Sequence, residues 1–136
     1  VQAKMIFAII IFVSIIAWGI ITRNDILDDT NNGNTAPSME TVGDLSNITY
    51  KQAVSYAKEN YKIAAYDTAL EWCDFAIQKE TKKASAYLVK AKVLYRQEYY
   101  DESKTIVNWA LNYTECSENV KQQFLDLSEK IDKKGQ

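Results

Sequence analysis

The chain has 136 residues, 47% of them hydrophobic and 25% charged, which leaves room for one modest folded domain. Its formal net charge is -2, from 16 basic and 18 acidic residues, so it lacks the basic character of a nucleic-acid-binding protein. Histidine is absent, and Cys73 and Cys116 have no CxxC spacing. We therefore expect no metal site, no cofactor and no catalytic group, and predict that the protein is not an enzyme.

The N-terminal stretch from Met5 to Ile21 contains no charged residue. A helix of this length spans roughly 26 Å, close to the thickness of the hydrocarbon core of a bilayer. Lys4 and Arg23 can snorkel from its two ends, and Trp18 suits the interfacial layer. We predict that residues 1–23 form a signal-anchor, a transmembrane helix that makes this a single-pass membrane protein. A cleaved signal peptide is the alternative.

Acidic residues follow the predicted anchor. Asp25, Asp28 and Asp29 lie after it and Lys4 lies before it, so the charges favour a cytoplasmic N-terminus and an extracytoplasmic C-terminal domain. Residues 24–48 contain the single proline, two of the four glycines and five acidic residues without a basic one. This composition predicts an acidic, flexible linker.

Residues 49–136 are predicted to form the folded domain. Thr49 and Gln52 match a capping box, in which each side chain bonds a backbone amide at the start of a helix. At the other end, Gly135 is expected to close the last helix in the left-handed conformation, after basic residues in the final turn.

Apolar residues at three- to four-residue spacing predict four helices in this domain. They cover residues 50–62, 67–79, 85–97 and 101–113. Ser117 can cap a fifth helix, which has one apolar stripe. The stripe consists of Val120, Phe124, Leu127 and Ile131. The predicted fold class is all-α, with a transmembrane helix, a linker and a helical domain.

The domain repeats itself with a period of 34 residues. At this offset small or medium-sized residues pair with one another, and aromatic residues pair with aromatic ones. The matched pairs are Ala57 and Ala91, Tyr61 and Tyr95, Tyr66 and Tyr100, Ala69 and Ser103, Cys73 and Val107, Phe75 and Trp109, and Ala76 and Ala110. Such agreement indicates a duplicated unit. We predict two helical hairpins, at 50–83 and 84–117, and a capping helix at 118–134.

This pattern of small and large residues resembles the tetratricopeptide repeat (TPR) family, whose period is also 34 residues. The second unit follows the family pattern at Tyr87, Ala91, Leu94, Tyr100, Ser103, Val107 and Ala110. The first unit follows it at Ala57, Tyr66, Ala69, Cys73 and Ala76. The chain departs from the pattern at Ala53 and Lys90, where the family has an aromatic residue and a leucine, and at Thr81 and Glu115, where it has proline.

The resemblance implies that the first helix of each hairpin lines a concave surface. The partner-binding residues expected there are Lys51, Lys58, Tyr61, Lys62, Leu88, Lys92, Tyr95 and Arg96. Cations interleaved with tyrosines suit an extended peptide with acidic groups. The alternative is that the lysines are merely solvated and the two tyrosines merely pack. Val54 and Leu88 stand where the carboxylate clamp of some family members needs polar groups, so that arrangement is not expected.

The chain also contains two cysteines and two glycosylation acceptor patterns. Cys73 is expected to be a buried free thiol, with a disulfide to Cys116 as the alternative. Asn47 and Asn112 match the glycosylation acceptor pattern, but Thr49 has a second explanation as a helix cap.

The chain is thus predicted to be a membrane-tethered scaffold or adaptor that binds a protein partner through its repeat surface and the bilayer through residues 5–21. A small accessory subunit of a larger membrane complex is the alternative. A helical hairpin buries its apolar face only against a neighbouring hairpin. Because this chain has only two, a partner or a second copy of the chain is expected to cover the faces that have no neighbour.

Overall fold

The computed structural model describes residues 35–135. Within this range the chain forms six α-helices, and its only β-type pairing is an isolated bridge between Lys83 and Glu115. The expected all-α fold is therefore confirmed for the described part. The predicted anchor over residues 1–23 lies outside the described residues. None of the helices within 35–135 combines the length and hydropathy needed to cross a membrane.

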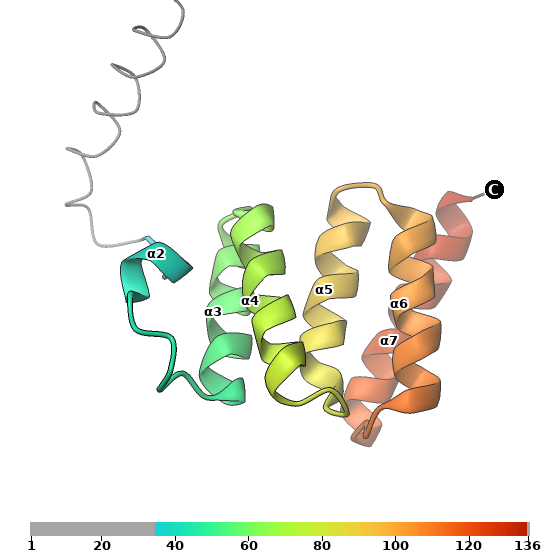
Figure 1. Cartoon of the computed structure of the whole chain (residues 1–136). Helices are drawn as coiled ribbons and strands as arrows, with labels where there is room; N and C mark the ends of the chain where they lie inside the picture. Colours follow the sequence, from blue (N-terminus) through green and yellow to red (C-terminus); the bar gives the residue numbers. More distant parts are fainter. Residues whose placement is uncertain (1–34, 136) are drawn as a thin grey trace, which may run out of the picture. The chain divides into compact units, whose positions relative to one another are not determined.

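Five of the helices form two layers (Figure 1). The inner layer contains α3 (Tyr50–Lys62), α5 (Ala84–Arg96) and α7 (Glu118–Lys134), and the outer layer contains α4 (Tyr66–Lys79) and α6 (Tyr100–Tyr113). Each hairpin pairs an inner helix with an outer one, α3 with α4 and α5 with α6, and α7 packs on both α5 and α6. The helices predicted from spacing agree with these bounds to within one residue.

The two hairpins repeat one another in local geometry. The aromatic pair Tyr61–Tyr66 has ring centroids 6.2 Å apart, and the equivalent pair Tyr95–Tyr100 has them 5.5 Å apart. Each pair links the end of an inner helix to the start of the next outer helix. The predicted 34-residue register is therefore present in the fold as well as in the sequence.

Helix starts follow the predicted caps. The Thr49 hydroxyl accepts from the Gln52 amide at 3.2 Å, and the Thr49 amide donates to Gln52 Oε1 at 3.0 Å. The Ser117 hydroxyl accepts from the Val120 amide at 3.4 Å and caps α7. The expectation for Gly135 is wrong, because its φ is -81° and it ends α7 in a right-handed conformation with its amide bonded to Ile131.

Small residues at the helix contacts allow the two layers to approach closely. The five alanines of the matched pairs are completely buried: Ala57, Ala69, Ala76, Ala91 and Ala110. The largest fully buried side chains are Trp72 in the first hairpin and Phe124 in α7. Lys90, where the TPR pattern has leucine, is half-buried and reaches Asp74 of α4 at 2.7 Å. The predicted apolar stripe of α7 packs against the second hairpin.

The N-terminal boundary differs from the prediction, because the folded unit begins at Ala36 and not at Thr49. The Pro37 carbonyl accepts two hydrogen bonds, from Trp72 Nε1 at 2.7 Å and from Asn60 Nδ2 at 2.8 Å. The short helix α2 (Met39–Val42) follows and packs against α4. Residues 36–48, predicted as linker, thus belong to the folded unit, and residues 24–34 lie outside the described residues.

Candidate functional site

The exposed face of the inner layer carries three adjoining hollows, which we call the groove. The first hollow has a volume of about 520 Å³ and is lined by Tyr61, Lys92, Tyr95, Arg96, Gln123, Asp126, Leu127 and Lys130. The second, about 260 Å³, is lined by Lys58, Tyr61, Lys62, Ser85, Leu88, Val89, Lys92, Val120 and Gln123. The third, about 330 Å³, is lined by Tyr50, Lys51, Val54, Ser55, Lys58, Lys83 and Ser85.

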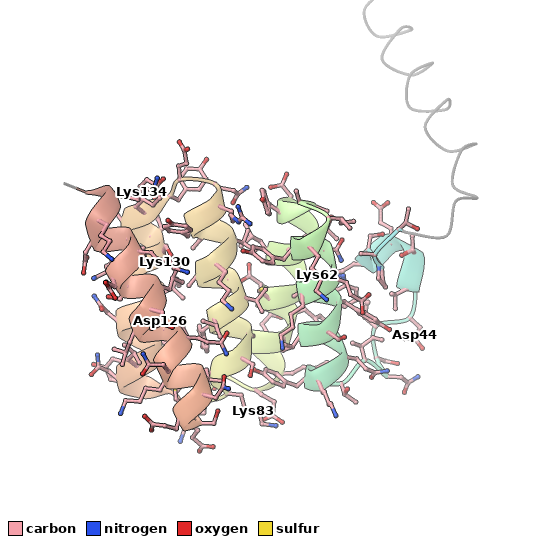
Figure 2. The ribbon with its side chains drawn as sticks, turned by 180° about the vertical axis from the view of Figure 1, so that it is seen from behind. Asp44, Lys62, Lys83, Asp126, Lys130 and Lys134 are labelled. Atoms are coloured by element: carbon pink, nitrogen blue, oxygen red, sulfur yellow. The ribbon has the colours of Figure 1, made fainter. Side chains whose placement is uncertain are left out.

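Helical periodicity explains why these side chains share one face. Lys51 and Lys58 are seven residues apart on α3, and Leu88 and Tyr95 are seven apart on α5, which is close to two turns. The groove brings together all eight residues that the sequence predicted. Figure 2 shows this face, with Lys62 on α3 and Asp126 and Lys130 on α7.

The floor of the groove is apolar. Val54, Leu88 and Leu127 are 5 to 6% exposed and belong to the two core clusters beneath the groove. Tyr61 and Tyr95 are half-buried and pack against these clusters while their rings also line the first hollow. The two tyrosines therefore pack against the core, as the alternative interpretation expected, and they also line the groove.

Two hydrogen bonds tie the groove walls together. Lys92 Nζ donates to Gln123 Oε1 at 2.8 Å, which links α5 to α7, and Arg96 Nε donates to the Tyr61 hydroxyl at 3.3 Å, which links α5 to α3. Burial lowers the pKa of Lys92, and the like charges of Lys58 and Lys130 lower it further. The hydrogen bond that Arg96 donates to Tyr61 raises the pKa of Arg96, which remains charged at any physiological pH.

Most of the groove cations have no acidic partner among the residues that the structure describes. Within residues 35–135, the salt bridges involve Lys83, Lys90, Lys104 and Lys133, and only Lys83 lines the groove. The groove cations outside these pairs are Lys51, Lys58, Lys62, Lys92, Arg96 and Lys130. Asp126 is the one carboxylate among the lining residues of the three hollows, and it accepts from Gln122 on its own helix at 2.9 Å. The groove therefore has a clear excess of positive charge.

Sequence reasoning missed the contribution of α7 to the groove. Gln123, Asp126 and Lys130 form one wall of the first hollow, although α7 was expected only to cap the array. A signal was available, since these three residues are spaced i, i+3 and i+7 and run beside the apolar stripe. A helix that buries one stripe against α5 must turn the adjacent stripe toward the groove.

The cysteines lie away from the groove. Cys73 is a completely buried free thiol, as predicted, and burial raises its pKa from 9.0 to about 12, with a further contribution from Asp74. Cys116 is free and half-buried, and its sulfur lies 3.3 Å from the Thr114 hydroxyl. The alternative, a disulfide between Cys73 and Cys116, is therefore not formed in the structure. Cys73 is not placed for nucleophilic chemistry, because it is inaccessible and its thiolate is disfavoured.

The two glycosylation acceptor patterns lie at the surface. Asn47 is exposed in the turn before α3, and Asn112 is exposed in the last turn of α6, where its Nδ2 donates to the Asn108 carbonyl at 2.7 Å. Modification at these residues stays a prediction.

Comparison with protein-family models, with curated proteins and with solved structures finds no match to this chain.

Proposed function

We propose that this protein is a non-enzymatic, membrane-tethered scaffold or adaptor of the TPR type, which holds an acidic segment of a partner protein in the groove between α3, α5 and α7. The observation that carries the proposal is the set of groove cations without acidic partners in the described part of the chain. The partner would supply the missing negative charge.

The groove combines the two kinds of contact that such a segment needs. Lys58, Lys62 and Arg96 can form charge-assisted hydrogen bonds with carboxylates, which are stronger than bonds between neutral groups. Tyr61 and Tyr95 offer aromatic surface to the apolar parts of the same peptide. An extended peptide fits better than a globular surface, because three hollows follow one another across the helices.

The proposed tether is short. Residues 24–35 connect the predicted anchor to the folded unit at Ala36. Even if fully extended, a segment of this length reaches only about 40 Å. An adaptor built in this way would hold its partner close to the membrane, on the side that the charge distribution predicts to be extracytoplasmic.

Charge reversal in the groove tests the proposal. In the full-length protein in mild detergent, Lys58→Glu combined with Lys92→Glu is expected to weaken binding of a fluorescent peptide rich in Asp and Glu by at least about tenfold, measured by anisotropy. Raising the salt concentration should weaken binding to the unmodified protein, because screening reduces attraction between exposed charges. Circular dichroism checks that the variant keeps its helix content.

The matched control reverses Lys82 and Lys121, which are exposed and line none of the three hollows. This double variant changes the net charge by the same amount but leaves the groove intact. Its affinity for the peptide should therefore stay within about twofold of that of the unmodified protein. Lys104 is unsuitable as a control, because it bonds Asp132 at 2.6 Å and Ser128 at 2.7 Å and thereby joins α6 to α7. Equal loss in both double variants would show that total charge, not the groove, controls binding.

An accessory subunit of a larger membrane complex is the second candidate. Trp109 and Tyr113 on α6 are 41% and 67% exposed, with ring centroids 5.5 Å apart, and neither lines the groove. Exposed neighbouring aromatic rings are typical of surfaces that another subunit covers. A stoichiometric complex that survives size-exclusion chromatography at high salt, and that Trp109→Ser dissociates, would favour this candidate over the adaptor.

A further inference from the structure

Lys92 occupies the centre of the groove. It lines both the first and the second hollow, it is half-buried, and Gln123 Oε1 holds its ammonium group between α5 and α7. Lys58 lines the second hollow from α3, and Lys130 lines the first from α7. Three consecutive inner helices thus each bring one ammonium group to the same pair of adjoining hollows.

The positive charges of these lysines repel one another. Burial lowers the pKa of Lys92, and the charges of Lys58 and Lys130 lower it further, so its charged form is disfavoured. Within the described residues, none of the three forms a salt bridge. Tyr61 lines both hollows, and its hydroxyl accepts from Arg96, so the hydroxyl proton can be donated to a bound anion.

The arrangement favours one chemical class of anion. A carboxylate is planar and carries a single charge on two oxygens. A phosphate monoester has three terminal oxygens in a tetrahedral arrangement and carries about 1.5 to 2 negative charges at pH 7. Donors that arrive from three separate helices match three oxygens that point in different directions, and the larger charge offsets more of the repulsion among the lysines.

We propose that Lys58, Lys92 and Lys130 bind one phosphoryl group, carried by a phosphorylated side chain of the partner segment. This inference rests on the proposed function, because it places the phosphoryl group in the same groove as the acidic peptide. Asp126, one helical turn before Lys130, is the carboxylate that lines the first hollow. Its bond to Gln122 on its own helix fixes its side chain within α7.

Three fluorescent peptides of otherwise identical, neutral sequence test the inference on the full-length protein in mild detergent. They carry a phosphoserine, an unmodified serine, or two adjacent glutamates at the central position. We expect the phosphoserine peptide to bind at least about tenfold more tightly than the diglutamate peptide. Lys92→Gln and Lys130→Gln should each remove most of this preference, whereas Lys121→Gln, on the opposite face of the same helix as Lys130, should leave it intact.

Each outcome decides between the two proposals. Equal binding of the phosphoserine and diglutamate peptides would overturn the phosphoryl subsite and leave the acidic-peptide adaptor standing. If neither peptide binds and the Asp- and Glu-rich peptide also fails, both proposals are wrong. A preference for phosphoserine that persists in Lys130→Gln overturns the subsite as well. Because Lys130 is exposed, this variant remains informative even if Lys92→Gln unfolds.

Discussion

Ala64 and Glu98 occupy equivalent positions in the two hairpins and share a left-handed backbone conformation, with φ of 61° and 65°. The residue after each one donates its amide to the inner helix, Ala65 to the Asn60 carbonyl and Tyr99 to the Leu94 carbonyl, both at 2.9 Å. Left-handed geometry costs a non-glycine residue roughly 1 to 2 kcal/mol. Packing of the flanking tyrosine pairs against the core explains why the turn tolerates this strain.

Glycine at these turns should therefore stabilise the protein. Glycine removes the steric cost of the left-handed conformation but adds about 0.5 to 1 kcal/mol of backbone entropy, so the net gain is expected to be about 0.5 to 1 kcal/mol for Glu98→Gly. Urea unfolding followed by circular dichroism measures the change. Ser55→Gly, at an exposed position inside α3, is the matched control and should instead lower the free energy of unfolding by about 0.5 to 1 kcal/mol.

The bond between Asn60 and Pro37 should contribute measurably to stability. Asn60 is 2% exposed, and its Nδ2 donates to both the Pro37 and the Tyr56 carbonyls. Asn60→Ala is expected to cost about 1 to 3 kcal/mol, because it removes these bonds from a buried site. The exposed Asn47→Ala should be nearly neutral in the same urea titration. A neutral Asn60→Ala would mean that residues 36–48 add little to the stability of the folded unit.

Enlarging a buried alanine tests the register of the second hairpin. Ala110 is completely buried and belongs to the cluster between α5, α6 and α7. Ala110→Leu should overpack this contact and lower the free energy of unfolding by about 1 to 3 kcal/mol. Asn112→Leu, on the exposed side of α6, serves as the comparison and should change the stability by less than about 0.5 kcal/mol. Equal effects would contradict the assigned faces of α6.

The two thiols should differ in reactivity. An alkylating reagent at pH 8 is expected to modify Cys116 in the native protein and to modify Cys73 only after denaturation, since Cys73 is inaccessible and its pKa is about 12. Mass spectrometry of the labelled peptides distinguishes the two sites. Rapid labelling of Cys73 in the native protein would show that α4 opens readily from α3.

The raised pKa of Cys73 predicts that the protein loses stability at alkaline pH. An unfolded Cys73 thiol loses its proton near pH 9, whereas the folded one keeps it to about pH 12, so the folded state holds more protons in this window and stability falls as the pH rises through it. Burial raises the pKa of Tyr50 and Tyr87, which act in the same direction. Cys73→Ala should therefore reduce the slope of stability between pH 9 and pH 12 without abolishing it.

Local signals explain which parts of the fold could be predicted. The helix bounds followed from spacing and from the caps at Thr49 and Ser117, because these signals act within a few residues of the chain. The role of Pro37 could not be predicted in this way. Its carbonyl is a backbone group that every residue has, and its donors, Asn60 and Trp72, lie far along the chain. A proline and glycine in a polar stretch therefore suggested a linker where the structure has a packed segment.

The groove could be predicted in part for a similar reason. Lys58 and Lys92 were identified because the repeat places them at equivalent positions on two first helices. Lys130 follows Arg96 by the same offset of 34 residues, but its place in the groove was missed because α7 was expected only to cap the array. The conformation of Gly135 was predicted wrongly because a glycine after a helix permits the left-handed form without requiring it.

The two bonds to the Pro37 carbonyl also determine how the folded unit would respond to mechanical tension. A pulling force applied along the chain from its N-terminal side reaches Pro37 before it reaches α3. Because both bonds end on a single oxygen atom, displacement of the Pro37 carbonyl would break both of them. Residues 36–48 would then peel from the first hairpin while the second hairpin and α7 stayed intact. Under such a load the Pro37 carbonyl would be the first contact of the folded unit to yield, before the helices that form the groove.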